Sequence, residues 1–262
     1  MNNFLEKTFR LQENNTNIKT EVLAGITTFM TMAYILAVNP IILSASGMDS
    51  GAVFAATAIS ACLGTLIMAF CSNYPFVLAP GMGLNAFFAY TIVGQMGYSW
   101  QVALGAVFLE GIIFLLLSLT KVREAIFNCI PPAIKFGVSG GIGLFIAFIG
   151  MQSSKLVIDG PTLVSIYPFK AALESGEFWS TGIGAVLAVF GVLITAIFLT
   201  KRVPGAILWG ILATWFAGIG CELTGIYVPN PQLGMFSVLP DFSKGISIPS
   251  LAPTFMQMDF SD

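Results

Sequence analysis

Seven long apolar stretches constrain the fold of this chain more than any other feature of its sequence. They run approximately over residues 22–43, 51–71, 74–96, 100–119, 131–151, 178–199 and 203–220. Five of them contain no charged residue, and the other two contain one each, Glu110 and Lys135. Helices of about 20 such residues cross the hydrocarbon core of a bilayer, which is about 30 Å thick. The sequence therefore predicts an all-α polytopic membrane protein with about seven transmembrane segments.

Composition supports this class and excludes several others. Charged residues make up 9% of the chain, whereas soluble domains carry about 25%. The net charge of −2 gives no reason to expect nucleic acid as a partner. The chain has no histidine, the commonest metal ligand and general base. Its four cysteines lack CxxC spacing, so we expect no metal, no cofactor and no disulfide framework.

The basic residues predict how the chain is oriented, because cytoplasmic loops are enriched in lysine and arginine. With a cytoplasmic N-terminus and seven crossings, eight basic residues lie inside and three, Lys155, Lys170 and Lys244, lie outside. We therefore expect a multi-pass protein of the plasma (inner) membrane. Its predicted parts are a cytoplasmic segment 1–21, a transmembrane region 22–220 and an extracytoplasmic, proline-rich linker 221–262. The way the chain stops within this linker favours a truncated protein.

The third apolar stretch does not have the sequence of an ordinary membrane helix. Pro75 and Pro80 bracket four apolar residues, and proline disfavours helix both at its own position and at the residue before it. Gly81 and Gly83 follow, and helix-compatible residues begin at about 84. We predict a short extended strand followed by a half-helix at membrane depth. Such a break is tolerated only where the backbone is buried in protein or lines a polar cavity.

Polar residues near this break are candidate binding groups. Asn85 lies in the first turn of the predicted half-helix, where its amide offers both a donor and an acceptor. In the first crossing, Thr27, Thr31 and Tyr34 share one helical face. The alternative for Asn85 is an interhelical hydrogen bond, and the alternative for each threonine is a bond to its own helix.

Two further features of the spans have competing explanations. Glu110 lies at the centre of the fourth crossing, and acidic groups at that depth usually face the bundle interior. It is a candidate for a proton-linked group or for a structural hydrogen-bond partner. Gly137 and Gly141 form a GxxxG pair, which we interpret as a helix-packing motif.

Three segments resemble the nucleobase–cation symporter family of xanthine/uracil permease type, and specifically its adenine/guanine/hypoxanthine permease branch. They are Thr20–Tyr34 with Asn39-Pro40, Ala79–Tyr90 and Pro131–Gly143. The similarity extends over essentially the whole chain, and the first two segments are fairly specific to that branch.

The resemblance implies a transporter of two inverted seven-segment repeats, of which this chain is the N-terminal one. Substrate would bind between helices 3 and 10, each beginning as a short strand, and purines would move inward with protons. The substrate-facing residues implied here are Gly83, Asn85, Ala86 and Phe87, with Thr31 and Tyr34 nearby. The expected partners are a purine nucleobase, the lipid bilayer and the missing C-terminal repeat, and a homodimer is left open.

The family's acidic binding and coupling residues lie in helices 8 and 10, which this chain lacks, so nothing is carried over to Asp241, Asp259 or Asp262. We expect the isolated chain to be inactive.

Other functional classes fit the sequence less well. A retinal protein needs a lysine in the seventh span, where residues 203–220 have none, and a receptor normally has its N-terminus outside. An intramembrane enzyme would lack histidine and paired intramembrane aspartates. A transporter of sulfate- or bicarbonate-type anions on the same fold remains the main alternative, since a half-helix dipole also suits an anion. A non-transporting membrane scaffold is the other.

Overall fold

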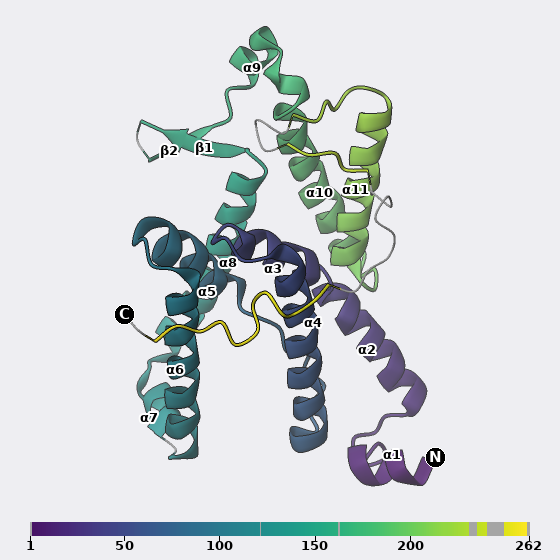
Figure 1. The fold of residues 1–262 in the computed structure, drawn as a ribbon. Helices are drawn as coiled ribbons and strands as arrows, with labels where there is room; N and C mark the ends of the chain where they lie inside the picture. The colour runs from purple at the N-terminus through teal and green to yellow at the C-terminus, as the bar shows by residue number, and fades with distance from the viewer. Residues whose placement is uncertain (1, 121, 162, 231–234, 240–248, 261–262) are drawn as a thin grey trace. The chain divides into compact units, whose positions relative to one another are not determined.

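A computed structural model describes residues 2–120, 122–161, 163–230, 235–239 and 249–260 of the chain (Figure 1). Lys121 and Lys244, which entered the orientation prediction, lie outside these residues, as do Asp241 and Asp262. The chain divides into two compact units. Unit 1 comprises residues 1–16, 34–145 and 248–262, and unit 2 comprises residues 17–33 and 146–247.

The described residues contain six helical segments long and apolar enough to cross a membrane. They are Ile18–Ser44, Ser50–Ser72, Trp100–Leu119, Pro132–Ser153, Gly182–Thr200 and Ala206–Leu223. Each coincides with one of the predicted apolar stretches, which confirms a mostly helical, multi-pass membrane protein. Their large apolar side chains remain extensively exposed, as expected of surfaces that face lipid rather than water.

The remaining apolar stretch, residues 74–96, is broken as its prolines predict. The chain turns at Asn73, whose φ is 51°, and residues 73–81 have no regular secondary structure. Helix α5 (Met82–Ala86) then begins after the extended Gly81 and continues into the π-helix η2 (Phe87–Gln95). The half-helix thus starts two residues earlier than predicted.

The predicted strand in this stretch is not paired with another strand in the described residues. A β-strand needs a neighbouring backbone to complete its hydrogen bonds. Here the N–H of Leu78 instead donates to the hydroxyl of Thr65 at 3.0 Å. The only sheet in the described part of the chain is the antiparallel hairpin of β1 (Val157–Gly160) and β2 (Leu163–Ile166), which lies between the fifth and sixth apolar stretches.

Unit 1 is built on helices α3 and α4, with α5 packed against α3. Its elements are α1 (Asn2–Phe9), α3 (Ile35–Ser44), α4 (Ser50–Ile67) with η1 (Met68–Ser72), α5, η2, α6 (Trp100–Leu119), α7 (Val122–Cys129) and the first part of α8 (Pro132–Ser153). The segment 249–260 also lies on this unit, because the N–H of Asp259 donates to the carbonyl of Gln101 at 3.1 Å. A Cβ added at Gly105 would meet the Asp259 carbonyl at 2.5 Å.

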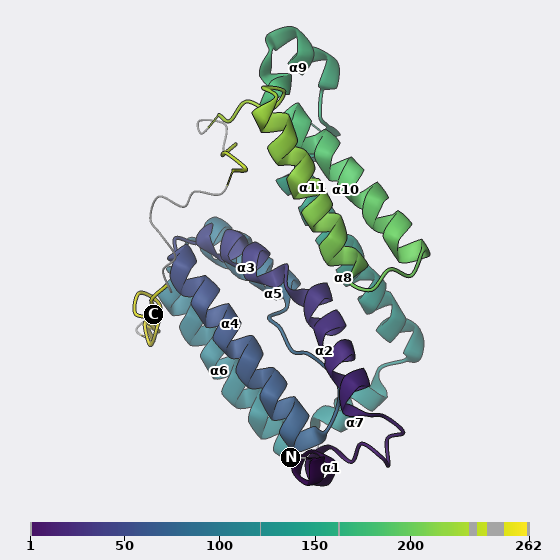
Figure 2. The ribbon, with the colours of Figure 1, turned by 90° about the vertical axis from the view of Figure 1, so that its right-hand side faces the viewer.

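Unit 2 is built on the antiparallel pair of α10 (Gly182–Thr200) and α11 (Ala206–Leu223) (Figure 2). It also contains α2 (Ile18–Met32), the β-hairpin, α9 (Phe169–Ser175) and the 3-10 turn η3 (Glu177–Trp179). Two glycine–threonine pairs let α10 and α11 approach closely. A Cβ at Gly210 would lie 1.9 Å from the Thr195 hydroxyl, and one at Gly191 would lie 2.5 Å from the Thr214 hydroxyl.

The chain after α11 folds back onto the end of that helix. The Glu222 carboxylate accepts hydrogen bonds from the Ser237 hydroxyl at 2.6 Å and the Val238 N–H at 2.8 Å. The Trp215 indole N–H donates to the Val238 carbonyl at 3.0 Å, and the buried Tyr227 hydroxyl donates to the Phe236 carbonyl at 2.7 Å. Residues 236–238 are therefore anchored to unit 2.

Replacing Gly210 by alanine is expected to destabilise the α10–α11 pair. The new methyl group must displace Thr195, and overpacking of this kind costs about 1–3 kcal/mol. The matched control is Gly220→Ala on the same helix, where a Cβ meets nothing within 4 Å. Thermal unfolding of the detergent-solubilised chain should show a lower midpoint for the Gly210 variant only. Equal midpoints for the two variants would contradict this packing.

One hydrogen bond of the anchor after α11, that of Tyr227 to Phe236, is expected to be lost at alkaline pH. Burial, and then the neighbouring Glu222 carboxylate, raises the pKa of Tyr227 above its ordinary value of 10.0. The neutral phenol is the form that donates to Phe236, so its contribution is complete below pH 10 and is lost as pH rises through the raised pKa. The tyrosinate absorbance of wild type minus that of Tyr227→Phe should titrate above pH 10. A difference titration at or below pH 10 would refute this expectation.

Candidate functional site

The start of the half-helix is tied to the first crossing by a side-chain hydrogen bond. Asn85, in the first turn of α5, is half-buried. Its amide Nδ2 donates to Oδ1 of Asn39 in α3 at 2.5 Å. The interhelical alternative for Asn85 is therefore observed, and its role in binding stays a prediction. Its Oδ1 and second N–H have no partner among the described residues.

This bond continues into the interior of unit 1. Asn39 is 2% exposed, and its Nδ2 donates to the hydroxyl of Thr57 in α4 at 2.7 Å. Thr57 is 3% exposed, and its hydroxyl donates to the Val53 carbonyl at 2.7 Å. Three helices are thereby connected through one line of polar groups. Sequence reasoning did not assign Asn39 or Thr57 to the site, although an asparagine before a proline in an apolar span was a usable signal.

The other predicted residues of the half-helix differ in their surroundings. A Cβ at Gly83 would lie 3.7 Å from the ring of Phe145 in α8, which is ordinary contact. Ala86 is 2% exposed and packs in the interior, whereas the Phe87 ring is 50% exposed. The Phe87 ring is therefore accessible, whereas the side chain of Ala86 is not.

The first-crossing residues divide between the two units. Tyr34 is half-buried at the interruption between α2 and α3, in unit 1. Thr31 belongs to unit 2, where its hydroxyl donates to the carbonyl of Thr28 at 2.7 Å. Thr27 and Thr28 bond to their own helix in the same way. The helix-bonding alternative thus describes all three threonines.

Glu110 lies midway along α6 and is exposed. Its carboxyl group has no hydrogen-bond partner within the described residues. The described part of the chain therefore contains no structural hydrogen-bond partner for Glu110. Among the same residues, no group of three or more acidic, cysteine or histidine side chains could hold a metal ion, and all four cysteines are free thiols.

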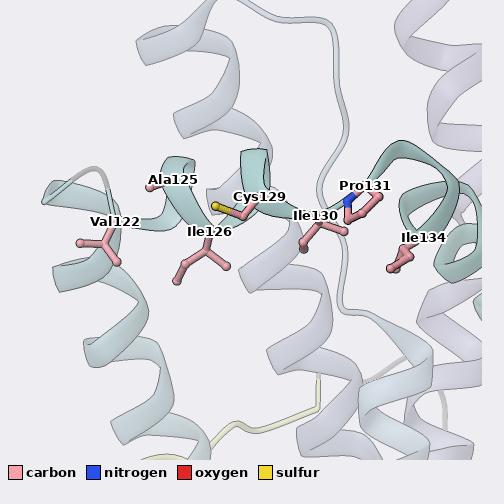
Figure 3. A pocket seen from close by; sticks show the side chains of 7 residues that line it. All are labelled: Val122, Ala125, Ile126, Cys129, Ile130, Pro131 and Ile134. Atoms are coloured by element: carbon pink, nitrogen blue, oxygen red, sulfur yellow. The ribbon is translucent and has the colours of Figure 1, made fainter.

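A separate hollow of about 570 Å³ lies where α7 meets α8 (Figure 3). Its lining is entirely apolar and consists of Val122, Ala125, Ile126, Cys129, Ile130, Pro131 and Ile134. Nearby, the Lys135 ammonium lies 3.9 Å from the centre of the Phe127 ring, within the range of a cation–π contact. A hollow without polar lining groups cannot orient a polar ligand, so we place the candidate site at Asn85.

Comparison with known proteins identifies the family. A family model described as "Permease family" (Xan_ur_permease) matches residues 19–249. The guanine/hypoxanthine permease PbuG of Bacillus subtilis is 43% identical over 95% of this chain and 53% of its own length. The adenine permease AdeP of Escherichia coli is 41% identical over 82% of this chain and 46% of its own. The guanine/hypoxanthine permease PbuO of B. subtilis is 42% identical over 79% of this chain and 46% of its own.

The chain spans about half the length of these curated relatives. The family model nevertheless covers well over half of the chain, and the identities exceed 40% across most of it. The resemblance seen in the sequence is thus confirmed, and the family is one of transporters rather than enzymes. The chain is a multi-pass membrane protein that belongs to the permease family.

Proposed function

We propose that this chain is one repeat of a transporter with two inverted seven-segment repeats, which imports purine nucleobases together with protons. The names of its relatives support the substrate class, because they are guanine/hypoxanthine and adenine permeases. The proposed site comprises Asn85 with Gly83, Phe87, Tyr34 and the backbone of the buried Ala86, all within unit 1.

The observation that carries this proposal is the interruption of the third apolar segment, with Asn85 in the helix turn that follows. Transporters build midplane sites from discontinuous helices whose freed backbone lines a cavity. Here the interruption ends at Gly81. In the helix that follows, Asn85 retains an acceptor and a donor, and the Phe87 ring is exposed. Hydrogen bonds and aromatic contact together are what a flat, polar heterocycle requires.

Proton coupling and orientation are parts of the same proposal. Glu110 is the candidate proton-linked group on this chain, since an unpartnered carboxyl at mid-span is costly when charged. The distribution of lysine and arginine supports a cytoplasmic N-terminus in the plasma membrane. A second repeat is the proposed partner that completes the site.

Transport of an inorganic anion on the same fold is the second candidate. It is favoured by the start of α5, where no side chain caps the helix, because uncapped N–H groups attract anions. The two candidates differ in which compounds compete for uptake.

The first experiment is uptake of radiolabelled hypoxanthine by the transporter assembled from this chain and its second repeat. We expect saturable uptake that adenine or guanine inhibits, sulfate and bicarbonate do not, and a protonophore abolishes. Asn85→Ala should raise KM by about tenfold or more, because the ligand loses a hydrogen bond. Asn128→Ala, which removes an exposed amide on α7, is the control. Inhibition by sulfate but not by purines would favour the anion candidate instead.

The isolated chain is expected not to transport. The proposed transporter binds its substrate between two repeats, and this chain supplies one of them in the proposal. Proteoliposomes containing this chain alone should accumulate no more hypoxanthine than empty liposomes, whereas those containing both repeats should accumulate it. Accumulation by the chain alone would show that the second repeat is not required.

A further inference from the structure

We propose that Asn39 is a positioning residue that fixes which atom of the Asn85 amide faces the ligand. This inference rests on the proposed function. It adds that the site presents a hydrogen-bond acceptor to the ligand. Asn39, Thr57 and Asn85 form a hydrogen-bonded line with one consistent direction from α5 to α4. We call this line the amide relay.

The direction of the amide relay is set at its buried end. A threonine hydroxyl has a single proton, and that of Thr57 is donated to the Val53 carbonyl within its own helix. Towards any other group, the Thr57 oxygen can therefore act only as an acceptor. The group facing it must be a donor, and this requirement identifies the atom as Nδ2 of Asn39.

The same constraint passes through Asn39 to Asn85. Because Nδ2 of Asn39 is held by Thr57, Oδ1 of Asn39 faces the half-helix and must receive a donor. Only the Nδ2 of Asn85 can supply one from that side chain, so its Oδ1 is directed away from Asn39. Flipping either amide would place two acceptors or two donors face to face in a buried site, which is costly.

The exposed end of the amide relay therefore presents a carbonyl-type acceptor with fixed placement. A ligand that offers an N–H group, such as the ring N–H of a 6-oxopurine, is complementary to it. Sulfate offers only acceptors, so it has no group that can donate to this oxygen. The amide relay thereby counteracts the preference of the uncapped α5 start for anions, and it favours a heterocycle that carries N–H donors.

The test uses hypoxanthine uptake by the transporter assembled from this chain and its second repeat, with KM and Vmax measured separately. Thr57→Val removes the hydroxyl at nearly constant shape and releases the Asn39 amide. Asn39→Leu removes the relay altogether and serves as the second variant. Thr57→Ser restores a hydroxyl, and Ser60→Ala is the matched control. Ser60 is exposed on the same helix and bonds only to the Thr57 carbonyl.

We expect Thr57→Val to raise KM about tenfold with little change in Vmax, since one ligand hydrogen bond loses its fixed partner. Thr57→Ser should rescue KM. A set of hypoxanthines, each methylated at a different ring nitrogen, is tested as well. In wild type, the compound whose methyl group replaces the recognised N–H should bind more weakly than the others. This discrimination should shrink in Thr57→Val.

Other outcomes separate the inference from the proposed function. No purine uptake by wild type would overturn the proposed function. Purine uptake with unchanged KM and unchanged discrimination in Thr57→Val would overturn the amide relay alone. A fall in Vmax and in thermal unfolding midpoint at constant KM would also overturn it, because the hydroxyl would then serve stability only.

Discussion

The structure of this chain depends on one requirement, namely that backbone and side-chain polar groups at membrane depth find partners within the protein. Helices meet that requirement internally, and six of the apolar segments take that form. The segment at 73–81 cannot, because its prolines prevent a regular helix. In this segment the backbone N–H and C=O groups are therefore not bonded within a helix. The half-helix that follows contains Asn85.

The amide relay shows how a polar side chain can be held in such a site. Asn39 and Thr57 are almost completely buried, and their side chains form a hydrogen bond with each other rather than with water. Because a threonine bonded to its own helix can only accept, a local feature of α4 determines the polarity of a group on α5. The Thr57 hydroxyl, which bonds to its own helix α4, thus determines which atom of the Asn85 amide on α5 is free to bind a ligand.

Close packing in unit 2 follows a different rule. In lipid, the hydrophobic effect does not drive apolar helices together. They associate instead through close packing at small residues. Gly191 and Gly210 each leave room for a threonine side chain of the partner helix. The hydroxyls of those threonines donate hydrogen bonds to carbonyl groups of their own helices. The GxxxG pair of α8, which the sequence singled out, has open space at both glycines. A small-residue motif therefore permits packing without showing which helix will use it.

The sequence alone determined the class of the protein, the positions of the spans and the break in the third stretch. These features follow from local properties, namely apolar length, proline and glycine. The resemblance also indicated the family correctly. Only the tertiary structure decided that the extended segment lacks a paired strand in the described residues, that Ala86 is buried, and that Asn85 bonds to Asn39. These depend on which residues meet across helices, and neither periodicity nor spacing specifies the partner of a side chain.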